Sequence, residues 1–121
     1  MFFNKLKVED VSLADLKAGL ADGSIVLVDV RETNEYEAGH IHGAMLNPLS
    51  VFAPEKLPAA QGDKRIVLHC RSGKRSVTAL GLAQKAGRGD ITAHFGGGML
   101  AWQAAGEHVA TGNWSGEELN L

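Results

Sequence analysis

Short runs of aliphatic residues alternate along this chain with stretches of helical periodicity. The runs Ile25–Val28 and Ile66–Leu68 are continuous and rich in β-branched residues, which is typical of strands buried on both faces of a sheet. In chain order, the pattern predicts a helix over 12–22, a strand over 25–28, a short helix over 34–38, a short strand over 44–46, a strand over 65–69, a helix over 76–86, a strand over 91–95 and a short helix over 99–105.

This alternation predicts an α/β fold in which a mainly parallel sheet is covered by helices on both faces. Ser12 can cap the first helix, and Val11 can pack on Leu16 one turn further along. Ligand sites in such folds lie beyond the carboxyl ends of the strands. Two segments are therefore candidates for the site, one beginning at Asp29 and one at Cys70.

The composition is that of an ordinary soluble domain, with 121 residues, 45% of them hydrophobic and 21% charged. We assign residues 1–106 to the domain and residues 107–121 to a polar tail that is loosely docked or flexible, with Trp114 as an anchor. The net charge of −2 argues against nucleic acid as a partner. No apolar stretch could cross a bilayer and no signal core is visible, so we expect a cytoplasmic protein without a membrane partner.

The candidate chemistry centres on the single cysteine, Cys70, which lies between a predicted strand and a predicted helix. A lone cysteine excludes an internal disulfide, and it is often only a small buried hydrophobe. Here, however, three cations follow closely, namely Arg71, Lys74 and Arg75. Gly73 permits a left-handed turn, so that the loop can curl and aim its amides at one point as an anion nest.

These surroundings favour an anion at the cysteine. A free cysteine ionises at about pH 8.5, and a cationic loop at a helix N-terminus commonly brings the pKa to about 3.5–7.5. Alternatively, the three cations are only solvated side chains at the start of a helix. The helix dipole disfavours cations at that end by about 0.3–1 kcal/mol each, which counts against this interpretation. The loop from Arg71 to Ser76, Ser72 included, is therefore predicted to stabilise a thiolate, a persulfide or a bound thiosulfate.

The loop sequence Cys-Arg-Ser-Gly-Lys-Arg-Ser, residues 70–76, resembles the active-site loop of the rhodanese family of sulfurtransferases. Upstream, residues 29–44 resemble the family's other signature, and downstream Gly96–Gly98 with Trp102 resemble its last glycine-rich turn and helix. The match runs from about residue 12 to residue 106. His42 and Asn47 depart from the family's usual residues, which are proline and an aliphatic residue.

The resemblance implies a rhodanese-like fold with five strands and a ping-pong reaction. Cys70 would take the outer sulfur of thiosulfate or of a persulfide donor, and would pass it to cyanide or to a thiol, including that of a sulfur-relay protein. By position, the amides of residues 71–75 would cradle the sulfur and Arg75 would close the loop. Because the chain has no second thiol, another molecule must discharge the persulfide, so we expect Cys70 to be solvent-accessible. No cofactor is expected.

Two other functions stay open. Related phosphatases and arsenate reductases use Cys, five residues and then Arg, a longer loop that suits a tetrahedral oxyanion. Here that spacing leads to Ser76, and Arg75 comes one position earlier, which favours a single added sulfur. The second alternative is a non-catalytic or redox-sensing rhodanese-like binding module, against which the retained Cys70 and its cationic loop count.

Three charged residues are expected to support the loop from beneath. Asp29 and Arg31 are two residues apart at a strand end and share a face, with Glu35 close by. We expect them to form an ion-pair network rather than to contact substrate. The network is then a determinant of stability, and activity would be lost as a consequence of its disruption.

The histidines are given structural roles. His69 precedes Cys70 on a strand, so their side chains point to opposite faces, and packing or a backbone contact is favoured over a role as base. His40 is assigned a supporting role. His40 and His42 alternate in an extended segment but lack a third nearby ligand, so no metal is expected.

Overall fold

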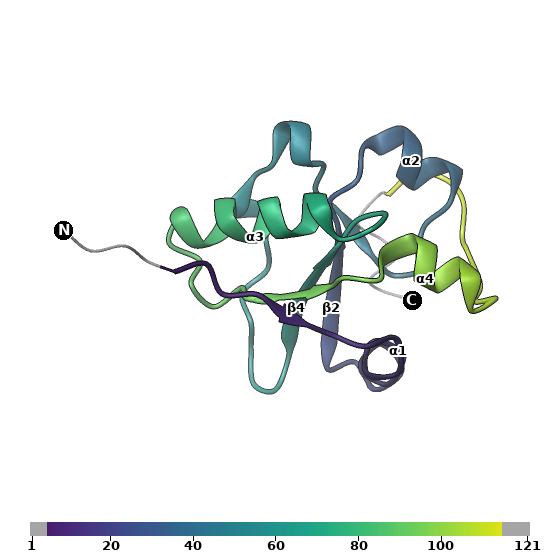
Figure 1. Ribbon diagram of the computed structural model, residues 1–121, viewed down its shortest axis with the longest axis horizontal. Helices are drawn as coiled ribbons and strands as arrows, with labels where there is room; N and C mark the ends of the chain where they lie inside the picture. The colour runs from purple at the N-terminus through teal and green to yellow at the C-terminus, as the bar shows by residue number, and fades with distance from the viewer. Residues whose placement is uncertain (1–4, 115–121) are drawn as a thin grey trace.

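The structure is a computed structural model that describes residues 5–114, and it contains a five-stranded sheet between helices (Figure 1). The strands are β1 (Glu9–Asp10), β2 (Ile25–Asp29), β3 (Met45–Leu46), β4 (Arg65–His69) and β5 (Ala93–Phe95). The helices are α1 (Leu13–Asp22), α2 (Thr33–Ala38), α3 (Lys74–Lys85) and α4 (Gly98–Ala104), with short 3₁₀ turns at Leu49–Val51 and Pro54–Lys56. The sheet order is β1-β5-β4-β2-β3, and every neighbouring pair is parallel.

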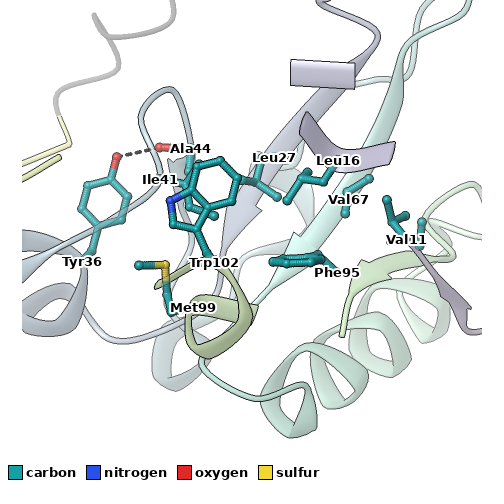
Figure 2. Close-up of a cluster of buried hydrophobic side chains, with 11 residues drawn as sticks. Val11, Leu16, Leu27, Tyr36, Ile41, Ala44, Val67, Phe95, Met99 and Trp102 are labelled. Atoms are coloured by element: carbon teal, nitrogen blue, oxygen red, sulfur yellow. Dashed lines mark hydrogen bonds between the residues drawn. The ribbon is translucent and has the colours of Figure 1, made fainter. Parts of the chain in front are cut away.

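Alternate side chains of the central strands enter two separate cores, one on each face of the sheet. Leu27 and Val67 belong to the first core, which contains Leu16 of α1 and Trp102 of α4 (Figure 2). Val28 and Leu68 belong to the second core, together with Ala79, Leu80 and Ala83 of α3. Figure 1 shows α3 and α1 on opposite sides of the strands. The predicted coverage of both faces is confirmed, and it explains why these strands are apolar without alternation.

The predicted elements are present, most of them with ends that differ by one residue; two begin two residues away from the prediction, and one strand was not predicted. Helix α3 begins at Lys74, two residues earlier than predicted, because Gly73 adopts a left-handed conformation with φ +98° and turns the chain directly into the helix. Strand β5 begins at Ala93 rather than at residue 91. Strand β1, which pairs with β5, was not predicted. It has only two residues, and because both are exposed and acidic, the sequence shows no hydrophobic pattern there.

Residues 107–114 of the predicted tail lie against α2 and α4. Ala110 forms an antiparallel bridge with His40, and the amide of Gly112 donates to the carbonyl of Glu37 at 3.0 Å. The indole of Trp114 packs against the first core. Residues 115–121 lie outside the described part of the chain, and the division of the chain at residue 106 stays a prediction. No helix within residues 5–114 is long and apolar enough to span a bilayer.

Candidate active site

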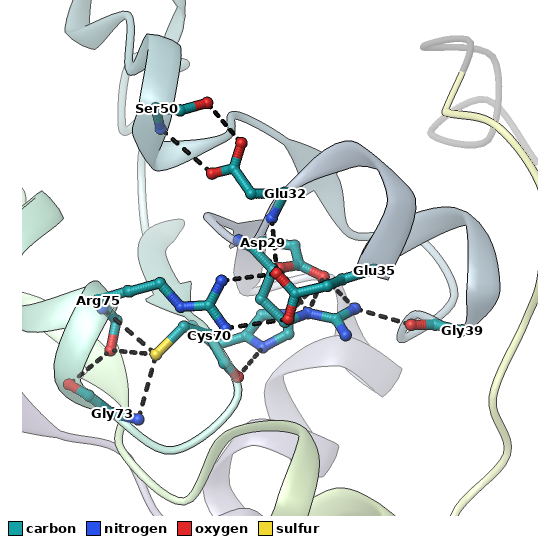
Figure 3. Close-up of polar contacts among 11 residues, drawn as sticks. Asp29, Glu32, Glu35, Gly39, Ser50, Cys70, Gly73 and Arg75 are labelled. Carbon is teal, nitrogen blue, oxygen red and sulfur yellow. Dashed lines mark hydrogen bonds and ion pairs between the residues drawn. The ribbon is translucent and has the colours of Figure 1, made fainter.

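The two candidate segments meet at the carboxyl edge of the sheet. Asp29 ends β2, and its partner in the adjacent β4 is His69, which directly precedes Cys70. From Cys70 the chain curls through Gly73 into α3 (Figure 3). Parallel pairing of β2 with β4 thus brings together residues that are about 40 positions apart in the sequence, as parallel strands place their carboxyl ends at one edge.

Backbone amides of the loop point at the sulfur of Cys70. The amide of Gly73 donates to Sγ at 3.1 Å and that of Ser76 at 3.4 Å (Figure 3). The hydroxyl of Ser76 lies 3.6 Å from the same sulfur. A side chain at Gly73 would require an unfavourable φ and would place its Cβ 2.8 Å from the carbonyl oxygen of Gly96. Glycine at this position is what allows the loop to close around the sulfur.

Two opposing effects set the acidity of the thiol. Burial by itself raises the pKa of Cys70, because it disfavours the charged form. Hydrogen bonds from the hydroxyl and amide of Ser76, and from the amides of Gly73 and Ser72, outweigh burial and lower the pKa below its ordinary value. The peptide groups of the loop therefore favour a thiolate, as the sequence predicts.

The cations of the loop are placed differently from the amides. Arg75 closes the loop against Glu35 of α2, with Nη1–Oε1 and Nη2–Oε2 distances of 2.6 and 3.0 Å, rather than against the sulfur. Glu35 raises the pKa of Arg75, burial opposes this effect, and charge on Cys70 adds a smaller increase. Arg71 and Lys74 are exposed. The amides thus make the direct contacts with the sulfur, and Arg75 interacts with it through charge and not through contact.

The expectation of an accessible thiol is wrong for this conformation, because the side chain of Cys70 is only 1% exposed. Its side chain belongs to the second core, and helix α4 docks on the backbone of the same segment. The amides of Met99 and Leu100 donate to the carbonyl oxygens of Cys70 and Arg71 at 3.0 and 3.2 Å. Docking of this helix on the loop was not visible in the sequence, since it joins segments almost 30 residues apart. In this conformation Cys70 is therefore almost closed to reactants from solvent.

Asp29 and Arg31 form the predicted pair beneath the loop. The guanidinium Nε donates to Oδ1 of Asp29 at 3.0 Å, and Nη2 donates to Oδ2 at 2.7 Å and to the carbonyl of Gly39 at 2.7 Å. Glu35 does not join this pair directly, since its carboxylate is held by Arg75. The network expected from the sequence is thus divided into a buried pair and a half-buried one.

His69 and His40 hold the backbone around the site. His69 is fully buried, with Nδ1 3.1 Å from the carbonyl oxygen of Cys70 and Nε2 3.6 Å from Oδ2 of Asp29. Burial lowers the pKa of His69 and Asp29 opposes this, so the ring supports the backbone as a neutral group. His40 stacks on Tyr36, and its Nδ1 lies 2.8 Å from the carbonyl of that residue. Within residues 5–114, no three His, Cys, Asp or Glu side chains are grouped to hold a metal ion.

His94 also belongs to this site, although it is part of no motif in the sequence. It lies on β5, and its Nδ1 is 2.8 Å from the hydroxyl oxygen of Ser76. His94 is 18 residues beyond Ser76, and no local pattern links the two positions. The parallel pairing of β5 with β4 creates this contact.

The Arg75–Glu35 pair predicts an acid-sensitive contribution to stability. The hydrogen bond from Arg75, opposed by burial, lowers the pKa of Glu35 from 4.5 to about 2. Because the folded-state pKa is the lower one, the stabilisation is complete above pH 4.5 and is lost as the pH falls to about 2. We expect the difference in free energy of unfolding between wild type and Glu35→Gln to shrink across this window.

Urea unfolding at a series of pH values measures this difference. The matched control is Glu107→Gln, which alters the ion pair between Glu107 and Lys17. The cation of that pair is more exposed than Arg75, so the substitution should change the free energy of unfolding little. A Glu35→Gln difference that stays constant from pH 4.5 to about 2 would contradict the prediction.

The fold and the site together define a class of protein: a parallel α/β domain with a cysteine-centred amide loop at the carboxyl edge of its sheet. The model of the rhodanese-like domain matches residues 12–105. The chain therefore belongs to the rhodanese-like domain family, as its motifs indicate.

Individual relatives agree with this assignment. The uncharacterized Synechocystis protein slr1261 is 46% identical over 69% of this chain and 45% of its own length. A sulfurtransferase from Allochromatium vinosum is 31% identical over 82% of this chain and 92% of its own. The human single-domain sulfurtransferase TSTD1 superimposes with a TM-score of 0.63 and 30% identity, over 78% of this chain and 95% of that structure. This chain spans only 25–45% of the length of several of the curated relatives that it matches.

Proposed function

We propose that this protein is a sulfurtransferase that carries a sulfur atom as a persulfide on Cys70. The observation that carries the proposal is the pair of amides, from Gly73 and Ser76, aimed at the sulfur at 3.1 and 3.4 Å. Such donors stabilise a sulfur anion both before and after it gains a second sulfur. The similarity to named sulfurtransferases supports the same chemistry.

The proposed reaction has two steps. In the first, the thiolate of Cys70 attacks the outer sulfur of thiosulfate, the S–S bond of the donor breaks, and sulfite leaves with the electron pair. In the second, cyanide or a thiolate attacks the outer sulfur of the persulfide, and the thiolate of Cys70 is released. The thiol acceptor belongs either to a small molecule or to a sulfur-relay protein. A persulfide donor would replace thiosulfate in the first step without changing the second.

A surface depression beside the loop supports an anionic donor. It has a volume of about 260 Å³, and its charged lining residues are Arg31, Arg71 and Glu35, the carboxylate of which is paired with Arg75. Arg71 is exposed at this depression, so its charge can attract an anion. Since Cys70 is buried, the donor would bind there first and would reach the sulfur when the loop moves.

Intact-mass spectrometry with thiosulfate tests the proposal. We expect the wild type to gain one sulfur atom, and subsequent cyanide to remove it as thiocyanate. Because the sequence has one cysteine, Cys70→Ala is a complete control and should show neither the adduct nor thiocyanate above the uncatalysed level. An unmodified thiol that still reacts with an alkylating reagent, after incubation with thiosulfate and with a persulfide donor, would reject the proposal.

The burial of the thiol in the described conformation favours a second candidate, a non-catalytic binding module, which predicts no sulfur gain. Burial does not favour the redox-sensing form of this candidate, which predicts reaction of Cys70 with peroxide and needs an accessible thiol. The phosphatase alternative predicts hydrolysis of an aryl phosphate that disappears in Cys70→Ala. The placement of Arg75 on Glu35 counts against it, since the arginine is not free to grip an oxyanion with both nitrogens.

A further inference from the structure

The hydroxyl of Ser76 connects the sulfur of Cys70 to a histidine on another strand. Its oxygen lies 3.6 Å from Sγ of Cys70, 3.1 Å from the carbonyl oxygen of Gly73 and 2.8 Å from Nδ1 of His94. Ser76 is fully buried and His94 nearly so. The contacts are therefore shielded from water, which would otherwise compete for them.

A hydroxyl group has one hydrogen to donate, and this limits what Ser76 can do. If Nδ1 of His94 carries no hydrogen, it competes with a sulfur anion for the hydroxyl hydrogen, and its shorter distance favours it. If Nδ1 carries a hydrogen, it donates to the serine oxygen, and the hydroxyl hydrogen is left for the sulfur. The hydroxyl of Ser76 also has the carbonyl of Gly73 as an acceptor, at 3.1 Å. That carbonyl accepts from the amide of Val77 at 3.4 Å as well, so it keeps a hydrogen-bond donor when the hydroxyl turns to the sulfur.

We propose that His94 is a positioning residue for Cys70: by donating its Nδ1 hydrogen to Ser76, it leaves the serine hydroxyl to donate to the sulfur anion. This hydrogen-bond arrangement rests on the geometry, and only the use of the sulfur anion in sulfur transfer rests on the proposed function. The arrangement strengthens the serine hydroxyl as a donor to the sulfur, beside the amides of Gly73 and Ser76. A donor that itself accepts a hydrogen bond is polarised by it.

Two ionisable groups face His94. Asp10 is its partner on the neighbouring strand β1, and Cys70 lies across Ser76. Burial lowers the pKa of His94, and the negative charge of Asp10 opposes this effect. The ring is therefore mostly neutral at pH 7, and the position of its hydrogen is a choice between two tautomers.

Nitrogen NMR of the wild-type imidazole reports this choice directly. We expect the neutral ring of His94 to carry its hydrogen on Nδ1 at pH 7. A neutral ring with the hydrogen on Nε2 would overturn the proposal, and this measurement needs no substitution.

Two variants of His94 test the effect on the sulfur. Asparagine can place an amide N–H where Nδ1 lies, whereas phenylalanine fills similar space without a donor. The ultraviolet absorbance of the thiolate, with Cys70→Ala subtracted, gives the ionised fraction of the single cysteine. We expect His94→Phe to lower the ratio of thiolate to thiol at pH 7 by about threefold to tenfold. Without the histidine donor the hydroxyl of Ser76 stays on the carbonyl of Gly73, and the sulfur loses one net hydrogen bond. His94→Asn should stay within about twofold of the wild type.

Combining each His94 variant with Ser76→Ala distinguishes an effect that passes through the serine hydroxyl from a purely structural role of His94. In the Ser76→Ala background the difference between His94→Phe and His94→Asn should vanish, because the group that joins histidine to sulfur is gone. An equal difference in both backgrounds, or no difference in either, would overturn the proposal. If His94→Phe does not fold, the NMR result and the His94→Asn titration decide. These titrations contain no sulfur donor, so failure of sulfur loading in the wild type leaves their outcome unaffected.

Discussion

Replacing Asp29 with alanine is expected to lower the free energy of unfolding by about 3–5 kcal/mol, because it leaves a buried charge without its partner. Asp29 is 0% exposed and Arg31 only 6%. In the wild type the carboxylate also accepts the amide of Arg31 at 2.9 Å, so the turn after β2 depends on it as well. In the variant, the guanidinium would retain the carbonyl of Gly39, a neutral partner, in place of an anion. Loss of sulfur loading should follow from the loss of folded protein.

Urea unfolding checks this value against a matched surface pair. Glu9 and Arg65 form an ion pair with an N–O distance of 2.7 Å, but both side chains are about half exposed. Glu9→Ala should therefore cost only about 0–1 kcal/mol. If Asp29→Ala proved no more costly than Glu9→Ala, the buried pair would not be the support that its geometry indicates. Replacing both Asp29 and Arg31 with apolar residues should recover part of the loss, because the unpaired charge is removed.

Replacing Gly98 with alanine is expected to displace the active-site loop and to abolish sulfur loading of the folded protein. Gly98 has φ +60°, and a Cβ there would collide with the carbonyl oxygens of Cys70 and Arg71. The left-handed conformation alone costs about 1–2 kcal/mol for a residue with a side chain. The collision adds to this cost, and it separates α4 from the carbonyls that accept the amides of Met99 and Leu100.

The control for this prediction is Gly89→Ala. A Cβ at Gly89 has no neighbour within 4 Å, and its φ is not in the left-handed region. Its free energy of unfolding should stay within about 0.5 kcal/mol of the wild type. Thermal unfolding and intact-mass spectrometry with thiosulfate give stability and loading for both variants. A Gly98→Ala protein that loads sulfur at the wild-type rate would show that the loop does not depend on close docking of α4.

The features that the sequence predicts are those encoded within a few neighbouring residues. The apolar runs at 25–28 and 66–68 identify the central strands, because a strand covered on both faces has no polar side to reveal. The position of Cys70 after such a strand, with Gly73 three residues later, indicates both the edge of the sheet and the curl of the loop. Asp29 and Arg31 are two residues apart, and their pairing follows from the alternation of side chains along the chain.

The amino-acid sequence thus determined the fold class, the cysteine and the amide loop around it, since periodicity and backbone freedom are local properties. Only the tertiary structure decided that Arg75 pairs with Glu35, that α4 docks on the backbone of Cys70, and that His94 contacts Ser76. Each of these contacts joins residues that are 18 to 40 positions apart, or two elements whose docking depends on strand order. Strand order follows from how the whole chain packs its two cores, and no short stretch of sequence records it.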